Sequence, residues 1–297
     1  MVDGTYSWEQ IIEDLADHQD LTPGQARWAM GEILGDRAEK ETIKSFLLAV
    51  QAKGETASEV EAFVGVMYNH CAPISITERA VDPVGTGGDG ANTINISTTA
   101  AIIARAAGAK VIKHGARAAS SKSGAADLLE ALGVTITLNG EQVAATFNEV
   151  GIGFCFAPSF HPAMRFAAPA RKELGQASVF NILGPLANPA KPKAVAIGVS
   201  KARVLPIMAD VLLERGAEGF LFRGDDGIDE ITLSTTTQIM QIHDGHKRIE
   251  TFDRGSRLIL LREKVCNSPK VCTPNPANRS KSACNTSTVV RASSKAR

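Results

Sequence analysis

Glycines, a carboxylate and several hydroxyl groups are concentrated between residues 84 and 98 of the chain. The stretch "VGTGGDG" is followed by polar side chains at Thr93, Asn95, Ser97 and Thr98. Glycines let backbone N–H groups approach a ligand closely, and the helix predicted to start near Ser97 directs its N-terminus towards an anion. The stretch lacks the lysine of a P-loop and does not fit G-x-G-x-x-G. For this loop alone, a tight turn without a ligand is the alternative interpretation.

A second loop contains the cations that a polyphosphate site needs, since a helix end contributes only about 0.3–1 kcal/mol to one exposed charge. The stretch "KHGARAASSKSGAAD" follows a strand predicted at "AKVI" and precedes a helix predicted near Gly124. Its polar side chains are Lys113, His114, Arg117, Ser120, Ser121, Lys122 and Ser123. A solvated basic loop is the alternative for this segment by itself. Two such loops on successive strands favour a substrate with several phosphates.

A third segment is acidic. The stretch "GDDGIDEIT" carries Asp225, Asp226, Asp229 and Glu230 at the boundary between a predicted strand and a loop. Mg²⁺ usually takes one or two carboxylates together with phosphate oxygens and keeps several waters. Beside a polyphosphate these carboxylates therefore predict a Mg²⁺ site, whereas without that context they would be an aspartate-rich surface turn.

The elements that position these loops fall into two groups. The first seventy residues contain four amphipathic segments with helical periodicity and no strand. Ser7 is a predicted N-cap with Gln10 three residues later, and Thr22 is a second N-cap followed by Pro23 at the first helical position. Gly35 follows the end of the second segment. These segments predict a small N-terminal all-helical domain.

From Val81 the pattern changes. Short apolar runs bounded by glycine alternate with helical segments, which predicts a larger α/β domain with a mostly parallel central sheet. Ligands of such sheets bind beyond the carboxyl ends of the strands, where each glycine cluster falls. The segment "DEITLSTTTQIMQIHDGHKRIETFD" predicts two strands in a hairpin with its turn at "HDGHK". The predicted domains are residues 1–73, joined in space by part of 160–190, and residues 74–262.

Residues 263–297 form a predicted disordered basic tail. They hold 7 of the 32 basic residues and only the acidic Glu263, so residues 1–263 carry 25 basic against 32 acidic groups. Residues 264–297 contain no Leu, Ile, Phe, Met, Trp or Tyr, and too little apolar surface is available to offset the entropy of ordering them. The acidic body argues against nucleic-acid binding, which needs a basic face.

Composition excludes other classes. No apolar run reaches the roughly 18 residues of a membrane helix, and "MVDGTYSWEQ" lacks the features of a signal peptide, so we expect a cytoplasmic protein without membrane contact. Cys71 and Cys155 are predicted buried thiols. Cys266, Cys272 and Cys284 match no C-x-x-C pattern, and we expect neither zinc nor a structural disulfide.

Six motifs together resemble one family. In order and spacing, "VGTGGDG", "NIST", "KHGARAASSKSG", "HPAMRFAAPARKELG", "FNILGPLANP" and "DGIDEIT" are similar to those of the anthranilate phosphoribosyltransferase family, over roughly residues 5 to 255. The resemblance implies a helical domain on an α/β domain, with the substrate site at the hinge. It also implies Mg²⁺-dependent transfer of ribose 5-phosphate from phosphoribosyl pyrophosphate to the amino group of anthranilate, in tryptophan biosynthesis, by a homodimer formed through the helical domain.

The resemblance assigns roles residue by residue. The contacts to phosphoribosyl pyrophosphate fall on Gly85, Gly88, Asp89, Thr93, Asn95, Ile96, Ser97, Thr98, Lys113, His114, Gly115, Arg117, Ser120 and Ser121. Anthranilate contacts fall on Gly85 and Arg171, and Mg²⁺ ligands on Ser97, Asp229 and Glu230. Lys113 and Arg171 are the expected catalytic residues, because loss of pyrophosphate depends on positioning and on charge stabilisation. His114 is expected to shape the site and not to act as a base, because an aromatic amine is largely unprotonated at pH 7.

The sequence departs from the family pattern at two places. Ala116 stands where the family usually has an asparagine that contacts anthranilate, and the lost amide should weaken or redirect substrate binding. The tail after about residue 262 replaces the strand and helix with which the family completes its α/β domain. Loss of large apolar and acidic residues at one point suggests translation in a shifted frame, and the other two frames of the gene test that hypothesis.

Two other functions are compatible with parts of the pattern. A pyrimidine nucleoside phosphorylase shares the architecture and a glycine-rich phosphate loop, but the two-carboxylate segment and "KHGARAASSKSG" favour the transferase. A non-catalytic relative that binds nucleic acid is disfavoured by the acidic body, and a basic tail would give only a salt-sensitive, sequence-independent contact.

Overall fold

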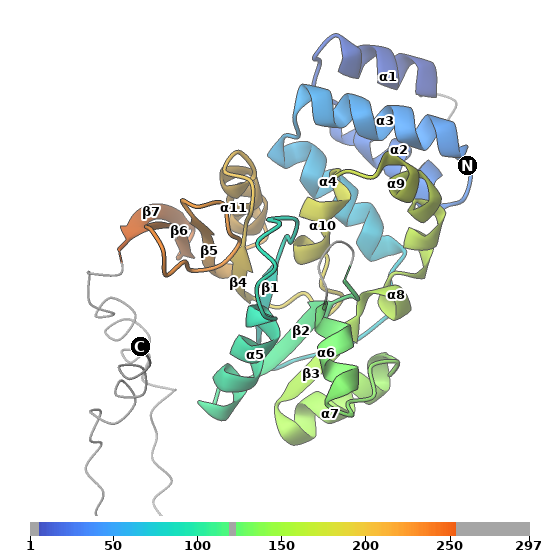
Figure 1. Cartoon of the computed structure of the whole chain (residues 1–297). Coiled ribbons are helices and arrows are strands. Elements are labelled where there is room, and N and C mark those ends of the chain that lie inside the picture. Colours follow the sequence, from blue (N-terminus) through green and yellow to red (C-terminus); the bar gives the residue numbers. More distant parts are fainter. Residues whose placement is uncertain (1–5, 119–122, 254–297) are drawn as a thin grey trace, which may run out of the picture. The chain divides into compact units, whose positions relative to one another are not determined.

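The computed structural model describes residues 6–118 and 123–253 (Figure 1). The expectations for the tail, for its three cysteines and for Ser120 and Ser121 concern residues outside these ranges. Of the two remaining cysteines, Cys155 is buried and Cys71 partly exposed. Within the described ranges, no helix combines the length and apolarity that crossing a bilayer requires.

Four helices form the N-terminal region, as predicted (Figure 1). They are α1 (Trp8–Ala16), α2 (Pro23–Leu34), α3 (Lys40–Lys53) and α4 (Ala57–Asn69). Side-chain caps start α1 and α2 where the sequence indicated: the Ser7 hydroxyl accepts from the N–H of Gln10, and Thr22 forms a capping box with Gln25. The N-caps therefore fix the register in which each apolar stripe meets the core.

A seven-stranded sheet follows, in the order β3-β2-β1-β4-β5-β6-β7. Its strands are β1 (Val81–Gly85), β2 (Val111–Gly115), β3 (Ile152–Phe156), β4 (Ala194–Gly198), β5 (Glu218–Gly224), β6 (Thr237–His243) and β7 (His246–Phe252). The first five are parallel and the last two antiparallel, which confirms the mostly parallel sheet. The predicted hairpin turn is confirmed at Asp244 and Gly245, whose φ angles of 48° and 73° suit a type I′ turn.

The predicted connecting helices are present as α5 (Ile96–Ala106), α6 (Ala125–Ala131), α7 (Gly140–Val150) and α11 (Val204–Glu214). Strand order reverses at β1, because β1 leads through α5 to β2 on one side and lies beside β4 on the other. Such a switch point leaves a crevice at the carboxyl ends of the strands. The loops after β1, β2 and β5, with the adjoining residues of β1, β2 and α5, carry all the predicted site residues except Arg171.

The stretch "HPAMRFAAPARKELG" predicts one helix, but the structure divides it between the 3₁₀ helix η1 (Pro162–Phe166) and α9 (Ala168–Leu174). The connection from β3 to β4 also contains α8 (Ala157–Phe160) and α10 (Phe180–Leu186). Pro162 and Pro169 lie in the first turns of η1 and α9, where a missing N–H is tolerated and a continuous helix is not. In Figure 1, α9 and α10 lie beside the first four helices, and α9 contacts α3 while α10 contacts α4.

The largest core cluster joins the helices to the sheet. It includes Phe46 and Phe63 of the first helices, Leu183 of α10, Met208 of α11 and Leu221 of β5, all fully buried. A second, smaller cluster lies around Ile112 and Phe147 under α7. The shared core therefore holds α4, α10 and α11 together, next to the end of the sheet that carries the loops.

Candidate active site

The glycine-rich loop runs from Gly85, the last residue of β1, to Asn95, the N-cap of α5. The Asn95 side chain accepts from the N–H of Thr98 at 3.0 Å, and α5 begins at Ile96. Gly87, Gly88 and Gly90 have φ angles of 64°, 76° and 71°, which residues with a side chain rarely adopt. The predicted strand-to-helix turn is thus confirmed, with the first turn of α5 directed towards the loop.

Asp229 returns from the loop after β5 to meet this turn. Its Oδ2 accepts from the N–H of Gly87 at 2.7 Å. A Cβ at Gly85 would lie 2.5 Å from the same Oδ2, and a Cβ at Gly198 would lie 1.7 Å from the Asp229 carbonyl oxygen. Because only glycine leaves that space at the ends of β1 and β4, these two positions bring the acidic segment against the glycine loop.

Three carboxyl groups share this region. Burial and the charge of Asp89 raise the pKa of Asp229, against the opposing effect of the Gly87 hydrogen bond. Burial and the charge of Asp229 raise the pKa of Glu230 to about 7, although Lys113 acts in the opposite direction. Negative charge is therefore concentrated in a partly dehydrated place, an arrangement that a divalent cation would relieve.

Lys113 lies in the middle of the neighbouring strand β2. It is 3% exposed, and its Nζ donates to the Pro83 carbonyl at 2.5 Å and contacts the Ser97 Oγ at 3.2 Å. Burial lowers its pKa, whereas Asp82 and Glu230 raise it. Two residues distant in sequence, Lys113 and Ser97, thus meet beside the first turn of α5.

His114 and Asp82 form a buried polar cluster beneath the loops. The Asp82 Oδ1 accepts from the His114 N–H at 3.1 Å, and the ring nitrogen Nδ1 of His114 lies 3.1 Å from the Gly184 carbonyl. Burial and the neighbouring ring of His161 lower the pKa of His114 to about 3, so the ring is neutral. A carbonyl only accepts, so Nδ1 carries the hydrogen. The buried Nε2 has no hydrogen-bond partner among the described residues.

Arg117 occupies the described part of the second loop. Its guanidinium contacts Asp127 at 3.2 Å and Glu130 at 2.5 Å, both on α6. Asp127 also accepts from the N–H groups of Ala118 and Gly124, which closes the base of the loop. The positive charge of Arg117 is consequently shared with two carboxylates in this conformation.

Arg171 and Ala116 are the positions predicted for anthranilate. Arg171 lies on α9 with its guanidinium 5.0 Å from the centroid of the Phe180 ring. Burial lowers its pKa, and none of the described carboxylates is within ion-pair distance of it. Ala116 is exposed, and its carbonyl accepts from the Ala126 N–H at the start of α6.

Two polar contacts escaped prediction. Asn188 donates to Asp82 Oδ2 at 2.8 Å and to the Ile112 carbonyl at 2.9 Å, which connects β1 to β2 below the site. Ser200 donates its N–H to Thr86 Oγ1 at 3.1 Å and its hydroxyl to the Gly87 carbonyl at 2.9 Å. An aspartate inside the apolar run "VDPVG" was the available signal for the first contact. Nothing in "GVSKAR" marked the second.

A surface cluster away from these loops brings three possible metal ligands together. Glu218, His243 and Asp244 are the one such group within the described ranges, with their ligand atoms within 4.8 Å of one another. The two nitrogens of His243 face different carboxylates, Glu218 at 3.5 Å and Asp244 at 3.2 Å. Arg79 also pairs with Glu218 at 2.5 Å. Glu218 thus already has a cationic partner in Arg79.

Family comparisons agree with this division into helices and sheet. The helical bundle domain of a glycosyl transferase family matches residues 9–71, and the α/β domain of that family matches residues 77–271. Fold and loop arrangement thus define a glycosyl transferase with a helical bundle joined to an α/β domain.

Comparison with individual relatives identifies the chain's family more specifically. An anthranilate phosphoribosyltransferase of Rhodococcus jostii is 49% identical over 260 residues, covering 86% of this chain and 72% of the relative. One of Acidothermus cellulolyticus is 50% identical over 253 residues, covering 85% and 71%. The chain belongs to the anthranilate phosphoribosyltransferase family, as its motifs predicted.

Solved structures of the same family have a similar fold. Anthranilate phosphoribosyltransferase from Thermus thermophilus is similar with a TM-score of 0.76 and 38% identity, over 82% of this chain and 72% of that one. The Saccharomyces cerevisiae enzyme in complex with phosphoribosyl pyrophosphate and Mg is similar with a TM-score of 0.76 and 29% identity, over 83% and 72%.

Proposed function

We propose that this chain transfers the phosphoribosyl group of phosphoribosyl pyrophosphate to the amino group of anthranilate, releasing pyrophosphate, as a step of tryptophan biosynthesis. Membership of the family supports the reaction. One observation supports assigning the reaction to these residues: Lys113, Ser97 and Asp229 all lie at the glycine loop. A cation, a helix N-terminus and carboxylates on one crevice suit a substrate with several phosphates and a metal ion.

The residues act mainly through position and charge. Departure of pyrophosphate leaves positive charge on the ribose and adds negative charge to the leaving group. In this proposal the Lys113 ammonium stabilises the leaving group from its buried place beside Ser97. Backbone N–H groups of the glycine loop, together with the side chains of Asn95 and Thr98, hold the phosphates. The N–H groups of Thr86, Gly87 and Ala91 already donate within the protein, to Gly198, Asp229 and Asp89. The amides between them, such as that of Gly88, are the ones proposed to bind the substrate.

The donor set fits Mg²⁺. Oxygen ligands are available from Ser97, Asp229 and Glu230, and the pKa values of the two acids, raised by burial and by neighbouring carboxylates, indicate unbalanced negative charge. When bound, Mg²⁺ would neutralise charge on the pyrophosphate oxygens. The role of Asp229 and Glu230 is to hold that cation against the glycine loop, and Asp89 adds a third negative charge.

Arg171 is proposed to orient anthranilate through its carboxylate. Its guanidinium is stacked on Phe180 and has no described carboxylate partner, so a charge-assisted pair with the substrate is open to it. The aromatic amine attacks in its neutral form. No strong base is required, and neutral His114 shapes the floor of the site. The yeast relative has been solved in complex with 4-fluoroanthranilate, which agrees with an aromatic amine of this kind.

We extend the proposal to three features of the whole protein. Residues 1–73, with part of 160–190, would act as a helical domain and residues 74–262 as the phosphoribosyl pyrophosphate domain. A homodimer would form through the helical domain. The reaction uses soluble, charged metabolites and would take place in the cytoplasm.

Loss of anthranilate fluorescence on addition of phosphoribosyl pyrophosphate tests the function directly. We expect turnover that depends on Mg²⁺ and that falls most at limiting Mg²⁺ in the double variant Asp229→Asn with Glu230→Gln. Phosphorolysis of uridine and thymidine is measured in parallel. A folded sample that cleaves these nucleosides and leaves anthranilate unchanged would overturn the proposal, and an unaltered metal dependence would remove the two acids from the site.

A further inference from the structure

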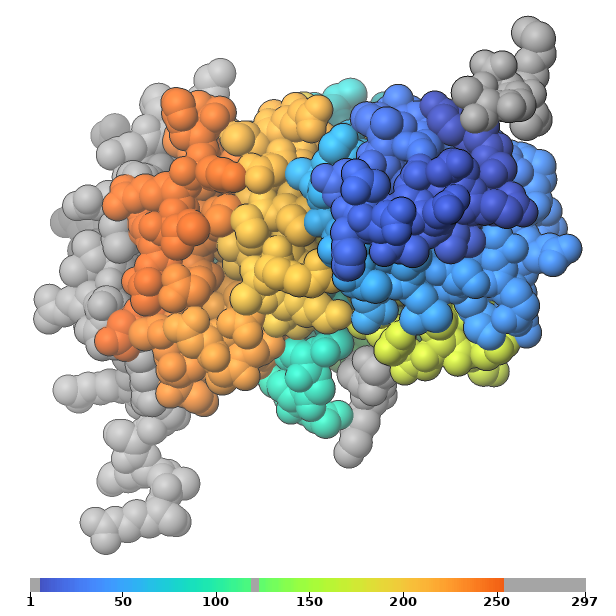
Figure 2. Space-filling model, turned by 90° about the horizontal axis from the view of Figure 1, so that it is seen from above, coloured from blue at the N-terminus to red at the C-terminus, as the bar shows by residue number. Residues whose placement is uncertain are grey.

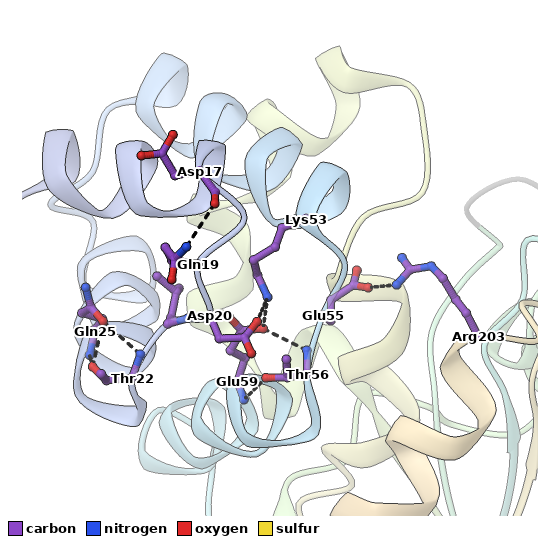
Figure 3. Close-up of polar contacts among 11 residues, drawn as sticks. Asp17, Gln19, Asp20, Thr22, Gln25, Lys53, Glu55, Thr56, Glu59 and Arg203 are labelled. Atoms are coloured by element: carbon purple, nitrogen blue, oxygen red, sulfur yellow. Dashed lines mark hydrogen bonds and ion pairs between the residues drawn. The ribbon is translucent and has the colours of Figure 1, made fainter.

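The corner between α3 and α4 is held by an unusually complete polar network (Figure 3). Glu59, which is fully buried, accepts from the N–H of Leu21 at 2.8 Å and of Thr56 at 2.9 Å, and from Lys53 Nζ at 2.9 Å. Lys53 also contacts Asp20 at 2.8 Å. The network joins the α1–α2 connection to both helices of the corner, so the corner is a fixed point of the helical region.

Glu55 extends from this corner towards the α/β region. It lies between Gly54, with a φ of 92°, and Thr56, the N-cap of α4. Its Oε2 is 2.5 Å from Nη1 of Arg203, the N-cap of α11, as Figure 3 shows. The Glu55 side chain is 2% exposed, whereas that of Arg203 is 45% exposed. Figure 2 shows the blue helices packed directly against the gold residues near position 200.

The segment that carries Arg203 also holds the glycine loop. Three residues before Arg203, Ser200 bonds to Thr86 and to the Gly87 carbonyl. The Ser200 carbonyl in turn accepts from Arg223 Nε at 3.0 Å, so the segment is fixed to β5 as well. Glu55 is therefore connected to Gly87 by the Arg203 ion pair, by the short chain segment from Arg203 back to Ser200, and by the hydrogen bond of Ser200 to the Gly87 carbonyl. The N–H of Gly87 in turn donates to Asp229.

A pocket lies between the two ends of this series. Gln51 and Glu55 line it from the helical corner, and Thr86–Gly88 from the glycine loop. The wall is completed by Ser178 before α10, by Asn181 within it, and by residues 199–201, 203 and 204. The Glu55–Arg203 pair thus lies at the border between the helices and the loop proposed to bind phosphates. If that border opened, the glycine loop would lose its support on this side.

A second ion pair joins the same two helices without touching the loop. At the far end of α11, Arg215 contacts Glu61 of α4 at 2.6 Å and the Leu186 carbonyl at 2.8 Å. Glu61–Arg215 therefore provides a matched comparison, because it holds α4 to α11 but has no contact with Thr86, Gly87 or Ser200.

We propose that Arg203, paired with Glu55, is a positioning residue that holds the glycine loop in the conformation that binds phosphoribosyl pyrophosphate. The inference rests on the proposed function and adds a residue remote from the reacting atoms. Arg203 does not touch the substrate in this proposal; it acts through Ser200 and the Gly87 carbonyl.

The effect of substitution should be asymmetric, because Glu55 is buried and Arg203 is not. Arg203→Gln leaves a buried carboxylate without its cation, which must turn towards water and open the corner. We expect KM for phosphoribosyl pyrophosphate to rise about tenfold in Arg203→Gln and about two- to threefold in Glu55→Gln, with kcat within about twofold of the original. Arg203→Lys should recover most of the loss, and the double variant should be no worse than Arg203→Gln alone.

Two controls separate positioning from other causes. Glu61→Gln removes the distant pair and should lower the melting temperature without altering KM. Lys201→Gln removes a neighbouring exposed cation on the same segment. If KM rose as much in Lys201→Gln as in Arg203→Gln, the positive charge of the segment alone would explain the effect. If KM rose as much in Glu61→Gln, a general loosening of α4 from α11 would explain it. Either result overturns the proposal.

Hydrogen exchange gives a readout that does not depend on turnover. In the substrate-free protein, amides of Thr86–Gly90 should exchange faster in Arg203→Gln than in the original chain, while Glu61→Gln leaves them unchanged. If the original chain showed no anthranilate turnover, the proposed function would fail while this comparison still tested the contact. Unchanged exchange at the glycine loop in Arg203→Gln refutes the positioning role whatever the activity.

Discussion

Two lysines, Lys53 in the helical region and Lys113 in the α/β region, have opposite surroundings. The Lys53 side chain is 3% exposed and contacts two carboxylates, Asp20 and Glu59. Lys113 is buried as a whole residue, and its Nζ contacts a carbonyl and a hydroxyl. Burial lowers the pKa of both; at Lys53 hydrogen bonds to Asp20 and Glu59 outweigh it and raise the pKa, whereas at Lys113 the pKa stays lowered.

The difference separates a structural charge from one suited to a ligand. Lys53 and Glu59 satisfy each other within the fold, so neither has an electrostatic need for a further partner. Lys113 lacks a contacting carboxylate within the described ranges, while Asp229 and Glu230 nearby have raised pKa values. Opposite charges are thus held close to the same loop without being paired. A bound metal ion would pair with Asp229 and Glu230, and a polyphosphate would pair with Lys113.

The substitution Lys113→Met should have the largest effect on activity of the variants that test this difference between the two lysines. We expect kcat/KM to fall by about a thousandfold, because one preorganised cation at a developing negative charge has an effect of that order. Stability should be unchanged or greater, since a buried ammonium with a lowered pKa is replaced by an apolar chain of similar length. Anthranilate fluorescence and urea unfolding measure the two quantities. A large loss of stability with little loss of activity would make Lys113 a structural lysine like Lys53.

The reciprocal variant is Lys53→Met. It leaves Glu59 buried without its cation, and the free energy of unfolding should fall by about 3–5 kcal/mol. Where the protein is still folded, kcat/KM should fall by no more than the roughly tenfold expected for Arg203→Gln, because the network reaches the glycine loop only through Glu55 and Arg203. Urea denaturation followed by circular dichroism gives the first value. Adding Glu59→Gln should recover part of the stability, and a further decrease would contradict the explanation.

The pH dependence of Mg²⁺ binding sharpens the contrast further. The pKa of Glu230 is raised from 4.5 to about 7, so native Glu230 binds a proton that the unfolded chain releases, and metal-free stability should decrease as pH rises from about 4.5 to 7. Mg²⁺ competes with that proton, so its affinity should fall by up to about tenfold per pH unit below 7. Melting temperatures at pH 6 and pH 8, with and without Mg²⁺, test this. Glu230→Gln should flatten the dependence.

The smallest expected effect belongs to Ala116→Asn. An amide at this exposed position of the second loop would offer anthranilate one additional neutral hydrogen bond. KM for anthranilate should decrease by at most about tenfold, since such a bond contributes about 0.5–1.5 kcal/mol. Steady-state kinetics at saturating phosphoribosyl pyrophosphate measure it. Ala118→Asn, two residues further in the same loop, is the control and should leave KM unaltered.

Local signals predicted the elements well where the pattern was long or capped. Ser7, Thr22 and Pro23 marked helix starts that the structure confirms, and "HDGHK" marked the hairpin. The region around α9 was predicted as a single helix because apolar residues recur there, but two prolines divide it. The short α8 and α10 went unpredicted, since four and seven residues are too few to establish a period.

Residue types and motif order were enough to indicate the chemistry: glycines with a following helix for phosphates, a basic loop, and adjacent carboxylates for Mg²⁺. They could not indicate the charge state of these side chains or their hydrogen-bond and ion-pair partners, because both depend on burial and on residues far away in the chain. Folding put Asp229 on the N–H of Gly87, 142 positions away, paired Arg117 with acids of α6, and placed Arg203 against Glu55. Dehydration and distance in the folded chain, and not local sequence, therefore decided which charges are free to meet a substrate.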